Sequence, residues 1–215
     1  MFESRSGILL IAGIGFFLLA FLSNGLVPVL MYRDMPEQTA EEVVNRNLLI
    51  QFDDLKSRYP DGYAQLKARL GPELSDRDLC AATLRYARDI YIGEGCWHCH
   101  SQFVRPVSNE SRRWGPVAKS SEYQNELQRP VMFGTRRVGP DLSREGGRRS
   151  NDWHAVHFYR PKSLSEDSVM PEYPWFFDGE PTKPNDRGMA IITYMQWLGS
   201  SLPHYFNNFQ DPLRP

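Results

Sequence analysis

The segment EGCWHCH, residues 94–100, has two cysteines separated by two residues and followed at once by a histidine. This C-x-x-C-H pattern is the attachment signature of c-type haem. Two thiols at this spacing reach the two vinyl groups on one edge of a haem, and the adjacent histidine gives the iron its proximal nitrogen. We therefore expect one covalent haem c, held by Cys96, Cys99 and His100. A large apolar cofactor would also organise the loop-rich segment that follows.

Two other kinds of site also use a C-x-x-C pair. In a thioredoxin-like site the pair follows a strand and opens a helix, whereas here it closes a predicted helix. A Cys₂His₂ zinc site could add His154 and His157. However, 54 residues separate Cys99 from His154 and only two lie between the histidines, which differs from zinc-finger spacing. The haem interpretation is favoured over both.

A haem iron needs a second axial ligand, and methionine is the usual one in small c-type cytochromes. Four methionines follow the motif: Met132, Met170, Met189 and Met195. The last two lie on a predicted helix, where core packing explains them better. Met132 lies before a Phe-Gly loop and stays open as a ligand. Met170 lies in the prolyl segment VMPEYPW, residues 169–175.

The turn GPDL, residues 139–142, is a second local signature, 39 residues after His100. The carbonyl of a loop proline, here Pro140, can accept a hydrogen bond from the distal nitrogen of a ligand histidine and fix its tautomer. Alone, such a segment could be an ordinary turn. Its position between the haem motif and a Met-Pro segment favours the functional interpretation.

Charge is uneven along the chain. Residues 105–149 contain ten arginines or lysines and five acidic residues, a balance of +5. This basic stretch could be a solvated face, could dock an acidic partner or could pair with the haem propionates. Arg105, Arg136 and Arg137 are our candidates for the propionate contacts, because arginine favours bidentate pairing with carboxylates.

Composition is typical of a folded protein. The chain has 215 residues, of which 41 % are hydrophobic and 24 % charged, with a formal net charge of −1. This net charge does not suggest binding to nucleic acid, which would need a strongly basic face. Three cysteines are too few for a disulfide scaffold, and the third, Cys80, is expected to be buried. Acid–base pairs, activated nucleophiles and phosphate loops are not recognisable, so we expect no catalysis by this chain alone.

Residues 7–32 contain no charged side chain. As a helix at ~1.5 Å per residue they would reach roughly 39 Å, enough for a ~30 Å hydrocarbon core. A cleaved signal peptide is the alternative. The run is long for one, MFESR has no net positive charge and no A-x-A-like site follows. We predict a retained membrane anchor over residues 1–34, whose flanking charges do not set its orientation.

The rest of the chain predicts a mainly α protein with long loops. Apolar spacing predicts a helix from a capping box at Thr39 to residue 59, a short helix over 63–70, and helices over 75–92 and 186–198. No extended period-2 pattern suggests a strand. We therefore divide the chain into a helical insertion (35–74), a haem domain (75–202) and a C-terminal tail (203–215). The insertion either packs on its own domain or offers a surface to a partner, and the sequence does not decide.

Four segments in order resemble the monohaem subunit II of cbb(3)-type cytochrome c oxidases, a family of haem–copper oxygen reductases. They are EGCWHCHSQFVRP (94–106), FGTRRVGPDLSREGG (133–147), DWHAVHFYRP (152–161) and MPEYPWFF (170–177). The resemblance implies a class I-like cytochrome c domain on one N-terminal transmembrane helix. It also implies a place in the bacterial inner (cytoplasmic) membrane, with the haem domain on the periplasmic side.

The resemblance implies an electron-transfer role and a set of partners. Electrons would come from a dihaem cytochrome c subunit or a soluble cytochrome c, and would pass to the catalytic haem b/copper subunit, where oxygen is reduced. Carried over by position, Met170 becomes the distal ligand and Pro140 supports His100. His154 and His157 fall in the family's W-H-x-x-H segment. We expect both on a short helix away from the iron, as structural or interface groups.

Residues 34–80 are longer and more acidic than this family leads one to expect, and Cys80 is not a family feature. These departures concern the partners rather than the haem. The small cytochrome c subunit of a nitric oxide reductase is the alternative, although it should lack this series of motifs. A free-standing membrane-tethered electron shuttle is a third possibility.

Overall fold

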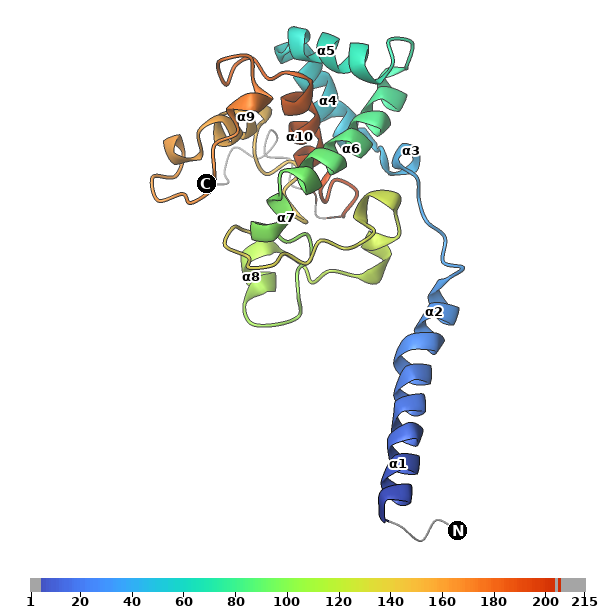
Figure 1. The fold of residues 1–215 in the computed structure, drawn as a ribbon. Coiled ribbons are helices and arrows are strands. Elements are labelled where there is room, and N and C mark those ends of the chain that lie inside the picture. The colour runs from blue at the N-terminus through green and yellow to red at the C-terminus, as the bar shows by residue number, and fades with distance from the viewer. Residues whose placement is uncertain (1–4, 204, 206–215) are drawn as a thin grey trace. The chain divides into compact units, whose positions relative to one another are not determined.

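The computed structural model describes residues 5–203 and 205 and divides the chain into two compact units, Met1–Glu37 and Gln38–Pro215. In the first unit, α1 (Arg5–Ala20), the π-helical segment η1 (Phe21–Leu26) and α2 (Val27–Tyr32) form one helix (Figure 1). This helix has 28 residues, a mean hydropathy of 2.3 in its most apolar window and no side chain buried in that window. It is long and apolar enough to cross a membrane, as the sequence predicted.

Two polar side chains within this apolar helix bond to its own backbone. The Ser23 hydroxyl donates to the carbonyl of Leu19 at 2.7 Å, and the Asn24 amide donates to that of Ala20 at 3.2 Å. Both groups are therefore satisfied without water, as a hydrocarbon environment requires.

The second unit is built from helices and loops, which confirms the mainly α prediction. Among the described residues no strand forms, and extended segments meet only in two isolated bridges. The helices are α3 (Ala40–Val43), α4 (Arg46–Arg58), α5 (Pro60–Leu70), α6 (Asp76–Gly93), α7 (Cys96–Cys99), α8 (Glu110–Trp114), α9 (Asn151–Tyr159) and α10 (Asp186–Trp197). Short 3₁₀ turns are η2 (Ser120–Tyr123), η3 (Glu126–Gln128), η4 (Pro161–Ser163) and η5 (Pro174–Phe176).

The core of this unit lies between α6 and α10, which pack against each other more extensively than any other pair of helices (Figure 1). Leu79 and Leu84 of α6 and Ile191 and Tyr194 of α10 are fully buried. Burial of each of the three aliphatic side chains contributes about 1.5–3 kcal/mol to the free energy of unfolding. Cys80 is also fully buried on α6, as predicted, and burial raises the pKa of its thiol to about 12.

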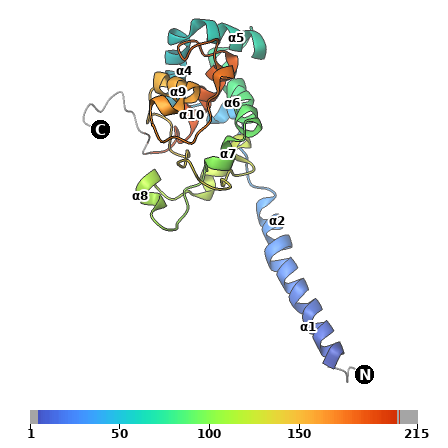
Figure 2. The same ribbon diagram turned by 60° about the vertical axis from the view of Figure 1, so that its left-hand side comes forward.

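Helices α4 and α5 pack against α6 and α10 and share the same core. Leu48 and Phe52 of α4 and Leu66 of α5 are fully buried. Gly62 allows close approach, because a Cβ there would lie 2.1 Å from the carbonyl oxygen of Pro184. Figures 1 and 2 show α4 and α5 at the end of the unit remote from α8.

Helix boundaries follow local caps, and two of them differ from the boundaries predicted from the sequence. The capping box at Thr39 forms, but the predicted helix over 39–59 is interrupted, because Asn45 accepts a hydrogen bond from Leu48 N at 3.1 Å and starts α4 anew. The short helix predicted over 63–70 begins three residues earlier, because Pro60 occupies the first position of α5, where its missing N–H costs nothing. Of the predicted tail, residues 204 and 206–215 lie outside the described residues.

Candidate haem site

The haem motif lies directly beyond the end of α6. Gly95 there has a left-handed φ of +70°, which side chains with a Cβ rarely adopt, and it turns the chain into α7. Cys96 and Cys99, three residues apart on this single turn, lie on the same side of it. Cys96 is buried and Cys99 is exposed. His100 follows in extended conformation.

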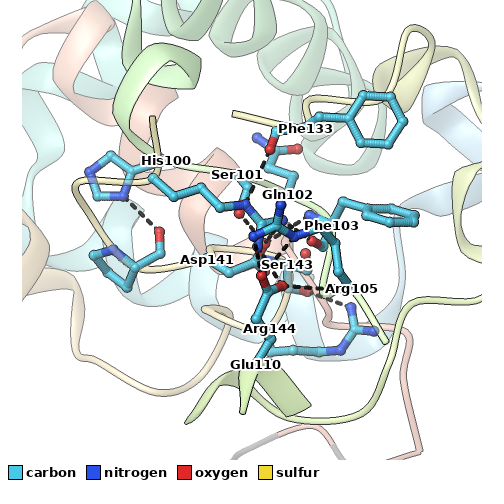
Figure 3. A network of polar contacts seen from close by, with 12 residues as sticks. His100, Ser101, Gln102, Phe103, Arg105, Glu110, Phe133, Asp141, Ser143 and Arg144 are labelled. Atoms are coloured by element: carbon cyan, nitrogen blue, oxygen red, sulfur yellow. Dashed lines mark hydrogen bonds and ion pairs between the residues drawn. The ribbon is translucent and has the colours of Figure 1, made fainter. Parts of the chain in front are cut away.

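The GPDL turn contacts His100 as the sequence predicted. His100 Nδ1 lies 2.9 Å from the carbonyl oxygen of Pro140 (Figure 3), and Gly139 N donates to the carbonyl of Cys99 at 3.1 Å. Because a carbonyl can only accept, Nδ1 carries the proton and the Nε2 lone pair is left free to bind a metal. Burial lowers the pKa of His100, against a smaller opposing effect of the Pro140 carbonyl, so the imidazole is neutral, as a ligand must be.

A buried carboxylate holds the turn against the segment that follows His100. Asp141 accepts hydrogen bonds from Ser101 Oγ at 2.5 Å, Phe103 N at 2.8 Å and Ser143 N at 2.9 Å (Figure 3). Leu142 N also donates to the carbonyl of Ser101 at 2.8 Å. These bonds fix the position of the Pro140 carbonyl, and through it the orientation of the His100 ring.

Gly139→Ala should displace the His100 ring. A Cβ at residue 139 would lie 2.3 Å from His100 Cε1, too close for any real contact. We expect a loss of about 1–3 kcal/mol in the free energy of unfolding, as for other overpacked sites. Denaturant unfolding of the haem-loaded chain measures it. The matched control is Gly93→Ala, where an added Cβ meets nothing within 4 Å. Equal stability of the two variants would contradict the packing at His100.

A cavity of about 540 Å³ opens beside the motif. This volume lies within the roughly 300–1,000 Å³ typical of ligand cavities. Its lining brings together five residues predicted from the sequence: Cys96, Cys99, His100, Pro140 and Met170. Apolar side chains complete much of the wall, including Val138, Leu142 and Phe158.

Two of the four candidate methionines line the cavity, Met170 and Met195, whereas Met132 and Met189 do not. Met195 is 3 % exposed on α10. Met170 is half-buried in the prolyl loop, which Tyr173 fixes at its far side. Tyr173 N donates to the carbonyl of Phe158 at 2.9 Å, and the Tyr173 side chain is buried.

Helix α9 carries the two histidines of the third motif, and Ser150 caps its N-terminus by accepting from Trp153 N at 3.1 Å. The predicted short helix forms, and both histidines line the cavity. His154 Nε2 and His157 Nδ1 are buried without a hydrogen-bond partner. Burial lowers the pKa of His154 to about 3 and that of His157 to about 4, so both are neutral.

The residues proposed for a zinc site do not come together. Among residues 5–203 and 205, no three His, Cys, Asp or Glu side chains are grouped closely enough to hold a metal ion. The cysteine pair and the α9 histidines therefore share a cavity without forming a Cys₂His₂ cluster.

The arginines lining the cavity differ from those proposed. Arg105, Arg136 and Arg137 are not part of the lining. Arg105 and Arg137 both bind Glu110, and Arg136 is exposed. The lining arginines are instead Arg148 and Arg149, two members of the basic stretch that were not among our candidates. Their signal was their place between the GPDL turn and the third motif.

The donor set and cavity fit haem c. Two thiols on one helical turn, a neutral histidine with Nε2 free, a methionine in a loop and an apolar wall are what a covalent haem with two axial ligands requires. Arg148 and Arg149 are suited to the carboxylates at the polar edge of a haem.

Comparison with known proteins agrees with this geometry. The sequence model of one family, described as "Cytochrome C oxidase, mono-heme subunit/FixO", matches residues 80–187, about half of the chain. The search of curated proteins found no match to the chain. The matched segment contains the haem motif, the GPDL turn, α9 and the prolyl loop. The chain therefore belongs to the FixO family of mono-haem cytochrome c oxidase subunits.

Proposed function

We propose that this chain is the electron-transfer subunit of a cbb(3)-type haem–copper oxidase, and passes electrons through one covalent haem c to the catalytic haem b/copper subunit. The observation that carries this proposal is that Cys96, Cys99, His100 and Met170 all line the same cavity. The family of the chain supports the same role.

Each residue has a separate task in this proposal. The thiols of Cys96 and Cys99 would hold the haem through thioether bonds to its vinyl groups. His100 would bind the iron through Nε2, while its Nδ1, 2.9 Å from the carbonyl oxygen of Pro140, keeps the ring oriented. When bound, the haem carries one electron by alternating between Fe(II) and Fe(III). The apolar wall excludes water and so favours the reduced state.

Met170 is the proposed distal ligand. Pro171 restricts φ directly after Met170, and Pro174 begins the short turn η5, so the loop beside the cavity has few backbone conformations available. A thioether ligand raises the haem potential, which suits delivery of electrons to an oxidase. Met195 also lines the cavity, but its place on α10 in the core favours packing.

We propose that the chain is held in the bacterial inner membrane by Arg5–Tyr32, with the haem domain in the periplasm. The helix is long and apolar enough for this, and bacterial haem attachment outside the cytoplasm, as the family resemblance implies, sets the side. The upstream donor would be a dihaem cytochrome c subunit or a soluble cytochrome c.

Purification of the tagged full-length chain in mild detergent tests the assembly. We expect it to bring with it a subunit that contains haem b and copper, measured by haem extraction and metal analysis, and untagged membranes serve as the control. An iron-containing but copper-free partner would contradict the oxidase assignment in favour of a nitric oxide reductase. Recovery of the chain alone would favour a membrane-tethered shuttle.

A further inference from the structure

The haem cavity contains a polar wall within its largely apolar lining. This polar wall consists of Glu145, Arg148, Arg149, His154 and His157. Its members are close to one another, since His154 Nε2 lies 4.0 Å from Glu145 Oε1 and the two arginines act electrostatically on the same carboxyl group. The charge of Glu145 is therefore influenced by its neighbours in the polar wall.

Glu145 is the acidic member of the polar wall, and its loop is fixed. Its side chain is 15 % exposed. The neighbouring Gly146 N donates to the carbonyl of Leu198 at 2.8 Å, and Gly147 N donates to Gln196 Oε1 at 2.9 Å. A Cβ at Gly146 would lie 2.4 Å from the carbonyl oxygen of Gln196. The backbone directly after Glu145 is therefore held against the end of α10.

The surroundings of Glu145 act on its pKa in opposite directions. Burial raises this pKa, and Arg148 and Arg149 of the same loop lower it. The effect of burial is the larger one, so the pKa of Glu145 rises to about 7. On α9, His154 and His157 are neutral at that pH. Helix α10 contributes Met195, which has no charge, to the lining.

The other acidic residues that line the cavity are placed differently. Asp141 accepts hydrogen bonds from Ser101 and Phe103, and Glu94 accepts one from Trp175 Nε1 at 3.1 Å. Asp167 is exposed. Asp141 and Glu94 thus accept hydrogen bonds, whereas burial shifts Glu145 toward the neutral acid.

We propose that Glu145 is a redox-linked proton site, which takes up one proton when the haem is reduced and releases it to solvent when the haem is oxidised. This inference rests on the proposed function. The oxidised haem carries one more positive charge, so it favours the Glu145 carboxylate, and by linkage the carboxylate favours Fe(III). The electron leaves for the next haem and the proton leaves for water, so charge and atoms balance.

The sign of the effect follows from this linkage. Raising the pH ionises Glu145, stabilises Fe(III) and lowers the reduction potential. With one proton per electron, the limit is a tenfold change in the Fe(III)/Fe(II) equilibrium per pH unit, about 59 mV for one electron. The fall in reduction potential should be centred near neutral pH, because burial raises the pKa of Glu145 to about 7.

Redox titration of the haem-loaded chain between about pH 5.5 and 9 tests the inference. We expect the wild-type potential to fall across neutral pH and the Glu145→Gln potential to be nearly flat there. The control is Glu180→Gln, which removes an equal charge from an exposed residue outside the cavity lining and should keep the fall. A flat wild-type profile, or an undiminished fall in Glu145→Gln, would overturn the proposal.

Should Glu145→Gln fail to fold, the wild-type protein still gives an answer. The infrared difference spectrum of reduced minus oxidised protein at neutral pH should contain a protonated carboxyl band, and its absence overturns the proposal. Failure of this inference is distinguishable from failure of the proposed function, because a chain that binds haem c and transfers electrons without a pH-dependent potential refutes the inference alone.

Discussion

The double variant Cys96→Ala/Cys99→Ala should carry no covalent haem. Both thiols of the motif are lost, and His100 and Met170 would hold a haem only by coordinate bonds, which denaturation breaks. On a denaturing gel the wild-type chain should stain for haem and the double variant should not.

Cys80→Ala is the matched control for that experiment. It removes the third thiol, which is fully buried on α6 and does not line the haem cavity. Haem staining should therefore persist in this variant. A double variant that still stained, or a Cys80→Ala chain that folded but did not stain, would show that the haem is attached elsewhere.

Met170→Leu should remove the distal ligand while keeping an apolar side chain of similar volume. The near-infrared band of sulfur-to-iron charge transfer should vanish, and the potential should fall substantially within the ~0.8 V range that axial ligands span. Near-infrared absorption and redox titration measure both effects.

The comparison with Met195→Leu makes this test specific, because Met195 is the other methionine that lines the cavity. That variant should keep the charge-transfer band and lose only packing energy in the core. If the band survives in Met170→Leu and disappears in Met195→Leu, the ligand lies on α10 and our assignment is wrong.

The parts of the site that the sequence predicted are those with local signatures. Cys96, Cys99 and His100 lie in one five-residue motif, and Pro140 lies in a turn whose backbone bonds pair it with the residues around His100. Within the haem motif, spacing along the chain nearly determines spacing in space. The contact of Pro140 with His100 joins residues 40 positions apart, and it was predictable only because the GPDL turn is recognisable as a motif. The capping box at Thr39 was predictable for the same reason, because its two side chains lie three residues apart on the chain.

The parts that the sequence did not predict depend on tertiary packing. Charge alone does not distinguish Arg148 from Arg105, since both lie in one basic stretch. In the fold Arg105 pairs with Glu110, whereas Arg148 lines the cavity. The residues of α9 have no clear apolar periodicity, so the face that turns His154 to the cavity could not be chosen. At Asn45, a side-chain cap competed with helix propagation and prevailed.

The mass of the intact, denatured chain tests the central claim most directly. Mass spectrometry of the purified protein should show the polypeptide plus the mass of one haem, and fragmentation should place that mass on the peptide containing Cys96–Cys99. A chain with the mass of the polypeptide alone, from cells that attach haem to other c-type cytochromes, would contradict the assignment of a mono-haem c subunit.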